Sequence, residues 1–133
     1  MQKFMCLVYF DEQSFAGITE AEDKALTDAT IEEDRQLREE GKLILAQPLD
    51  EPETAVNVRV REGRVLRTDG PFVESKEWLG GFMLITAATM DEAVSIAAAG
   101  EIPKRGRIEV RPILVQTHSV TGAGRPEFSE SGA

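Results

Sequence analysis

The side chains that could do chemistry lie between positions 69 and 78, where a carboxylate, a hydroxyl and an amine follow one another closely. Asp69 precedes a Gly-Pro pair, so its carboxylate either caps the backbone of its own turn or lines a pocket. In a pocket it could hydrogen-bond a ligand or act as a general base, and we therefore take Asp69 as the candidate catalytic residue. Ser75 and Lys76 could bind an anionic group, or they could belong to a solvated polar surface. No base is identifiable beside Ser75, so nothing marks it as a nucleophile.

Four further residues, three of them aromatic, could complete such a pocket. Phe72 is expected to anchor the core, with a pocket wall as the alternative, whereas Trp78 could form a pocket wall or a dimer contact. Tyr9 carries a hydroxyl that needs a partner if the ring is buried. Arg111 shares a strand face with Glu109, so it either forms an ion pair or holds a carboxylate ligand. The predicted ligand-binding residues are Tyr9, Phe72, Ser75, Lys76, Trp78 and Arg111.

The composition argues against several classes of function. A net charge of -9, from 24 acidic and 15 basic residues, argues against binding to nucleic acid or to an anionic membrane. Cys6 is the one cysteine, so no internal disulfide forms and no cysteine cluster holds a metal. We expect Cys6 to be a small core residue in a reducing, cytoplasmic setting. Since a glycine-rich phosphate loop is also missing, the sequence predicts neither a metal nor an organic cofactor.

Two helices are marked by their ends. Thr19 and Glu22 form a capping box that opens a helix over residues 20–40, and Gly41 is a typical residue just beyond a helix end. A narrow stripe of side chains faces the interior of the protein, and the remainder of this helix is charged. A second capping box, from Thr89 to Glu92, opens a shorter helix that closes near residue 100. The stripe consists of Leu26, Ala29, Thr30, Glu33 and Leu37.

The strands complete an α+β domain. Strands are predicted at 4–10, 43–46, 82–85 and 107–115, with an inserted β-hairpin of residues 56–61 and 64–67 and a structured loop over 70–81. The first of them is too short to span a bilayer and lacks a cleavage-like region. With the hairpin set aside, the order is that of a ferredoxin-like βαββαβ sandwich. At 133 residues the chain has the size of one domain, which we place at 1–117, followed by a flexible tail at 118–133.

The sheet of such a sandwich has one face without helices, and here that face is predicted to be apolar. The strands at 4–10 and 82–85 are apolar at both alternations, so neither of their faces suits water. A bare apolar sheet face would exceed the patch that a monomer tolerates. We therefore expect a homodimer in which two sheets pack face to face, with a cleft between them that could bind a small molecule.

The run Asp69-Gly70-Pro71-Phe72 resembles the signature of the DGPF branch of the YCII-related family. The resemblance extends over about residues 1–117. It is supported by the Gly80-Gly81 pair, the helix start at residues 91–93 and the strand from Gly106 to Pro112. The resemblance implies a dimeric α+β barrel. It implies little chemistry, since members of this branch are mostly uncharacterised. Many of them resemble genes found beside extracytoplasmic-function sigma factors. Other relatives carry a His–Asp pair proposed to be catalytic. The one histidine here, His118, lies beyond the last predicted strand, so the pair is incomplete.

Three functions remain open at the level of sequence. The first is a small-molecule binding or sensing protein with its pocket in the dimer cleft. The second is a cofactor-independent isomerase or lyase acting on a small acidic or aromatic compound, with Asp69 as base and Lys76 or Arg111 as electrostatic partner. The third is an accessory interaction protein of sigma-factor regulation that docks through the charged helix, although that charge is explained more simply by solubility.

Overall fold

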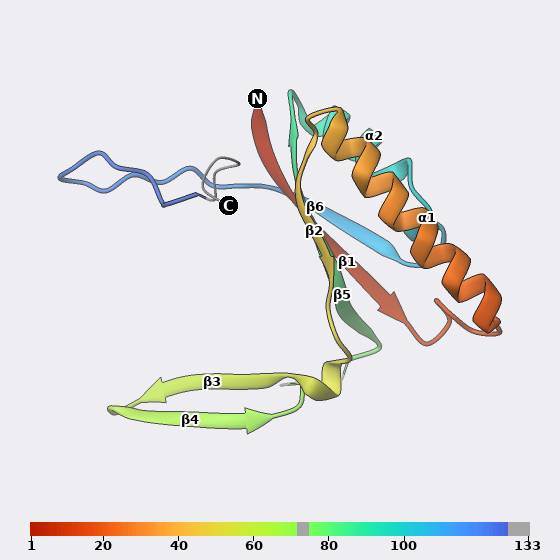
Figure 1. Ribbon diagram of the computed structural model, residues 1–133. Coiled ribbons are helices and arrows are strands. Elements are labelled where there is room, and N and C mark those ends of the chain that lie inside the picture. The colour runs from red at the N-terminus through yellow and green to blue at the C-terminus, as the bar shows by residue number, and fades with distance from the viewer. Residues whose placement is uncertain (72–74, 128–133) are drawn as a thin grey trace.

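The computed structural model describes residues 1–71 and 75–127, so Phe72 of the predicted pocket lies outside the described residues. Four strands form an antiparallel sheet in the order β2-β5-β1-β6, and both helices lie on one of its faces (Figure 1). This is the ferredoxin-like arrangement that the sequence predicts. The elements of this sandwich are β1 (Gln2–Asp11), α1 (Glu20–Glu39), β2 (Leu43–Pro48), β5 (Glu77–Ala87), α2 (Met90–Ala98) and β6 (Arg107–Pro112).

The ends of α1 are fixed by the signals read from the sequence. The Thr19 hydroxyl accepts a hydrogen bond from the Glu22 amide at 3.1 Å, and the Glu22 carboxylate accepts one from the Thr19 amide at 3.4 Å. At the other end Gly41 adopts a φ of 74°, which lets the Lys42 amide donate to the Leu37 carbonyl at 2.9 Å. Both predicted ends of α1 are thereby confirmed.

The core lies between the helix-facing side of the sheet and α2. Phe4, Cys6 and Ile85 are its largest fully buried side chains, and they pack with Ala93 and Ile96 of α2. Burial raises the pKa of the Cys6 thiol to about 11. The thiolate is therefore scarce at neutral pH, which agrees with the interpretation of Cys6 as an inert core residue.

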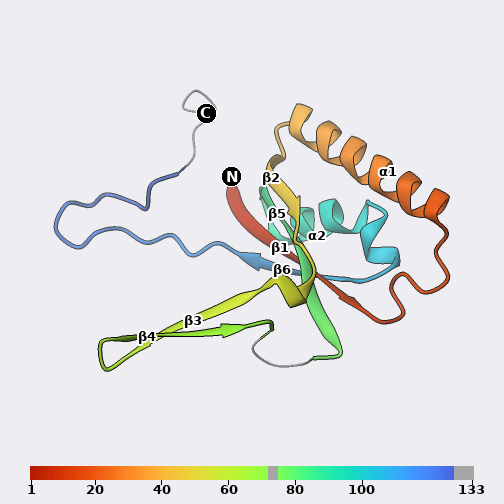
Figure 2. The same ribbon diagram turned by 60° about the horizontal axis from the view of Figure 1, so that its bottom comes forward.

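The opposite face of the sheet has an apolar centre, as the alternation predicts. Met5 and Leu7 of β1 stand beside Leu84 and Phe82 of β5 in the strand register. None of these four side chains is fully buried. Leu45 of β2 pairs with Leu84 and extends the surface toward the β2 edge. We call this side, which carries neither helix, the open face (Figures 1 and 2).

The predicted loop over residues 70–81 is wrong in its second half, because β5 begins at Glu77. Trp78 pairs with Phe10, and the register then shifts so that Gly80 has no partner on β1. A Cβ at Gly80 would overlap the Phe10 ring. The glycines that suggested a loop instead form a bulge that lets β5 continue past a bulky side chain. The last strand is shorter than the predicted 107–115, since β6 ends at Pro112.

Two segments project from the sandwich on the side of the open face (Figures 1 and 2). The first is the predicted hairpin, formed by β3 (Val56–Arg61) and β4 (Arg64–Asp69), which is a separate two-stranded sheet. Its turn residues Glu62 and Gly63 have φ values of 51° and 76°, as a two-residue hairpin turn requires. The second is the segment 113–127 that follows β6. We call these two segments the arms.

Candidate functional site

A cavity of about 1000 Å³ lies between α1, α2 and the helix-facing side of the sheet. Val8 and Phe10 of β1 contribute to its walls, as do Leu26 and Leu37 of α1 and Ile96 of α2. This volume is at the upper end of the range of ligand pockets, and walls that are mainly apolar are typical of them. The cavity is on the opposite side of the sheet from the predicted dimer cleft.

The cavity exists because the inner side of α1 carries few large apolar residues. Leu26 and Leu37, near the two ends of the helix, are separated by the small or polar residues Ala29, Thr30 and Glu33. These five are the predicted stripe, and all of them are half-buried. No residue of α1 is fully buried. Short side chains in the middle of α1 therefore leave the space beneath the helix unfilled.

The charged groups that line the cavity are mostly acidic. Burial and, secondarily, the charge of Glu33 raise the pKa of the Asp34 carboxyl above its ordinary value. The Glu33 carboxylate accepts a hydrogen bond from the Glu101 amide at 3.5 Å. The one lysine of the lining, Lys42, forms an ion pair with Glu40 at 3.2 Å. The site can thus offer hydrogen-bond acceptors and negative charge within apolar walls.

The raised pKa of Asp34 predicts a pH-dependent gain in stability from Asp34→Asn. The folded state disfavours the charged carboxylate. The free energy of unfolding of the wild type therefore compares best with that of the variant at pH values below the ordinary pKa of 3.8. That advantage is lost as pH rises through the raised value. We therefore expect the variant to have the higher urea midpoint at neutral pH and no advantage at pH near 3.

Asp28→Asn is the matched control for this comparison, because it removes the same charge from an exposed position of α1. A gain of equal size in both variants would reflect lower net charge repulsion alone. Such a result would contradict an effect of burial at Asp34.

Two of the predicted site residues, Tyr9 and Arg111, lie on the open face. The Arg107 guanidinium stands 4.4 Å from the centre of the Tyr9 ring. Arg111 lies 3.8 Å from the Glu109 carboxylate, which is the ion-pair alternative for this residue. Arg107 also donates two hydrogen bonds to Glu77, at 2.9 and 3.0 Å, and these lower the pKa of the Glu77 carboxyl. A row of alternating charges therefore borders the apolar centre of the open face.

Arg107 and Glu77 are not among the sequence-predicted site residues, although a signal for Arg107 was present. Positions 107, 109 and 111 alternate along one strand, so three charged side chains share a face. Glu77 could not be found in this way, because it falls in the segment that was predicted to be a loop.

The remaining predicted residues are spread along the base of the hairpin and the start of β5. The Asp69 side chain is 80% exposed and accepts a hydrogen bond from Arg67 at 3.2 Å. The Ser75 hydroxyl accepts one from the Glu77 amide at 3.2 Å, and Lys76 is exposed. Within residues 1–71 and 75–127, no hydrogen bond or ion pair joins any two of the predicted site residues. Whether a second copy brings them together stays a prediction.

His118 lies in the 113–127 arm, where its ring organises a turn. Its Nδ1 accepts hydrogen bonds from the amides of Val120 and Thr121, at 3.1 and 3.2 Å. The ring is exposed and does not line the cavity. Among the residues that the structure describes, no cluster of three or more His, Cys, Asp or Glu side chains could hold a metal ion.

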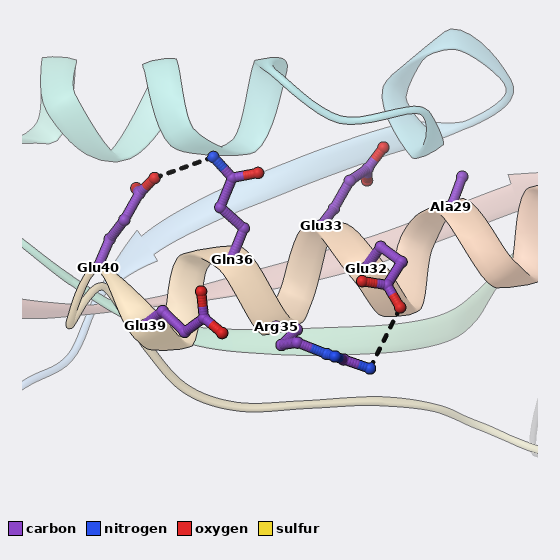
Figure 3. A pocket seen from close by; sticks show the side chains of 7 residues that line it. All are labelled: Ala29, Glu32, Glu33, Arg35, Gln36, Glu39 and Glu40. Carbon is purple, nitrogen blue, oxygen red and sulfur yellow. Dashed lines mark hydrogen bonds and ion pairs between the residues drawn. The ribbon is translucent and has the colours of Figure 1, made fainter.

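A second, more open hollow of about 710 Å³ lies along the flank of α1 (Figure 3). Its lining side chains come from α1 and from Glu40 just after it, and Glu33, Gln36 and Glu40 also line the cavity. Gln36 donates a hydrogen bond to Glu40 at 3.2 Å, and Arg35 forms an ion pair with Glu32 at 3.2 Å. This hollow lacks the apolar walls of the cavity, so the cavity is the better candidate site.

Comparison with known proteins gives a family but no activity. Residues 2–117 match the family described as "YCII-related domain". A protein of Rhizobium meliloti (strain 1021), described as uncharacterized, is 34% identical over 114 residues, which cover 84% of this chain and 92% of that relative. In the described part of the chain, neither helix has the length and apolar character needed to cross a membrane.

Proposed function

The chain belongs to the YCII-related domain family, and from that membership and the cavity we propose that it is a homodimeric protein that binds a small molecule between α1 and the sheet. The observation that carries this proposal is the cavity of about 1000 Å³ with mainly apolar walls and a few polar groups at its margin. A ligand that covered these walls would remove their apolar surface from water, which favours binding.

The lining determines which molecules would fit. The apolar walls favour a ligand with an aromatic or aliphatic body. Five acidic residues and one lysine line the cavity, and that lysine is paired, so an anionic group would be repelled. We therefore infer a neutral or cationic ligand, in which a hydroxyl or an amine donates hydrogen bonds to Glu33 or Asp34. The five acidic lining residues are Asp23, Glu33, Asp34, Glu40 and Glu92.

A probe titration tests this proposal directly. Phenylnaphthylamine, a neutral dye that brightens in apolar surroundings, should bind each subunit with a saturable increase in fluorescence. Phenylbutylamine and phenylbutyrate share an apolar body and differ in charge, so they are matched competitors. We expect the amine to displace the dye at a concentration at least tenfold lower than the carboxylate does. Preferential displacement by the carboxylate, or no saturable dye binding, would contradict the proposal.

A second candidate function is cofactor-independent acid–base catalysis, and Asp34 favours it. A carboxyl with a raised pKa beside a second carboxyl is the arrangement that general acid–base chemistry uses. The reaction would be an isomerisation or elimination on the bound molecule, with Asp34 rather than the exposed Asp69 as the base. Loss of turnover with retained binding in Asp34→Asn would distinguish catalysis from binding alone.

We also infer membership in the DGPF branch, from residues 69–72. The part of this motif that can be described fastens the base of the hairpin. Gly70 has a φ of 85°, its amide donates to the Ala55 carbonyl at 2.7 Å, and its carbonyl accepts from the Asn57 side chain at 2.8 Å. Such contacts support a structural role for the motif at the root of an arm. A ligand cleft at the dimer contact, a cytoplasmic location and a part in sigma-factor regulation stay predictions.

A further inference from the structure

We propose that the two arms clasp a second copy of this chain, with the valine side of the hairpin and the apolar residues of the 113–127 arm packed against it. This inference rests on the proposed homodimer and adds to it the segments that hold the dimer together. It is argued from the exposure of the arms, from the surface area of the chain and from the side on which the arms project.

The hairpin exposes an apolar surface that nothing in the described chain covers. Val58 and Val65 are 65% and 71% exposed, and the strand register places Val60 directly opposite Val65 on the same face. Arg67 and Asp69 lie on the valine side nearer the root and form an ion pair with each other. The other face carries Arg59, Arg61 and the exposed Leu66. A two-stranded hairpin is marginally stable in water when it stands alone, so a long exposed one needs a surface to pack on.

The second arm has the same character. It is fastened at its root, where the Ile113 amide donates to the Lys3 carbonyl at 2.9 Å, and Lys3 pairs with Glu127 at 2.8 Å. Between these points it leaves the sandwich with Leu114 and Val115 on its surface, 76% and 85% exposed. An arm anchored at both ends and apolar between them is suited to contact a partner.

The surface area of the chain is larger than that of a compact monomer. The accessible surface is 10098 Å². A compact monomer of 14.6 kDa would expose about 6,900 Å², so the excess is roughly 3,200 Å². A stable interface needs only about 800 Å² from each partner, so the excess leaves room for one.

The position of the arms favours a second copy over another partner. Both arms project on the side of the open face (Figures 1 and 2). An identical sheet with the same apolar centre would pack against this face and lie within reach of both arms. The alternating row of Glu77, Arg107, Glu109 and Arg111 beside this centre allows a two-fold copy to set opposite charges against one another.

Sedimentation of the full-length chain with paired variants tests the proposal. The double variant Val60→Glu/Val65→Glu places charge on the valine side of the hairpin, and Thr68→Glu does so on its other face. In the second arm, Leu114→Glu/Val115→Glu is compared with Ser119→Glu. We expect each double variant to raise the dimer dissociation constant at least tenfold, while Thr68→Glu and Ser119→Glu change it less than about threefold.

The outcomes separate the arms from the dimer itself. Dissociation by Leu84→Lys on the open face, combined with unchanged dimers in both double variants, would overturn the role of the arms and leave the homodimer standing. A wild type that stays monomeric at micromolar concentration would overturn both. Equal weakening by the double variants and by their single controls would show a general charge effect and would also contradict the arms. An unchanged helical circular dichroism signal serves as the check on folding.

Discussion

Leu84→Lys should convert the proposed homodimer into a monomer. Leu84 lies at the centre of the open face, where it stands between Met5 of β1 and Leu45 of β2 in the strand register. In a sheet-to-sheet dimer this position would be buried against the second copy, and an unpaired lysine charge there would have to lose its water. We expect the dissociation constant to rise on the order of hundredfold, which corresponds to about 2.7 kcal/mol.

Sedimentation velocity over a range of protein concentrations measures this effect. Ala25→Lys, on the exposed side of α1, changes the net charge by the same amount far from the open face, and it should leave the dissociation constant unchanged. The helical circular dichroism signal should be the same in both variants, because Leu84 does not belong to the core on the helix side. Unchanged dimers in Leu84→Lys would remove the open face from the interface.

The parts of the fold that the sequence predicts correctly are those with local signals. The capping residue Thr19, the glycine at 41 and the Glu62-Gly63 turn each fix a boundary through contacts within a few residues. The alternation along β1 indicates two apolar faces without reference to the remainder of the chain. From such signals the element order follows, and the order is sufficient for the ferredoxin-like arrangement.

The features that the sequence does not predict depend on contacts between distant segments. The early start of β5 requires Gly80 to pass the Phe10 ring, which lies 70 positions away along the chain. The cavity depends on how far α1 stands from the sheet. The sequence shows the stripe of α1. It does not show how far Leu26 and Leu37 hold the polar residues between them from the sheet.

The candidate site illustrates the same division. Residues were predicted around Asp69 because carboxylate, glycine and proline together are a recognisable pattern. That pattern serves the base of the hairpin, where the Asp69 carboxylate is exposed and paired with Arg67. Asp34, by contrast, lies in a charged stretch of a helix, and no local sequence motif points to it. Only its half-buried position in the cavity lining distinguishes it from the exposed acidic residues of the same helix.

Thr30→Trp should abolish the proposed ligand binding in the cavity while leaving the proposed dimer intact. Thr30 is half-buried in the middle of the inner side of α1, and its hydroxyl donates only to the Thr27 carbonyl of its own helix, at 2.9 Å. An indole at this position would occupy the space between α1 and the sheet without displacing a core residue. We expect the affinity for phenylnaphthylamine to fall at least tenfold. The unfolding midpoint should stay the same or rise, since apolar surface becomes buried.

The matched control is Ala25→Trp, which adds the same ring to α1 at an exposed position outside the cavity lining. This variant should bind the dye as the wild type does. The two tryptophan variants also distinguish the cavity from the predicted cleft at the dimer contact. Thr30 lines the cavity, whereas Tyr9 and Arg111 are on the open face. Unchanged dye binding in Thr30→Trp, together with a loss in Arg111→Ala, would place the ligand at the dimer contact. The four-stranded sheet separates the cavity from the open face, so a side chain in the cavity cannot reach that face. Each result therefore assigns the ligand to one face only.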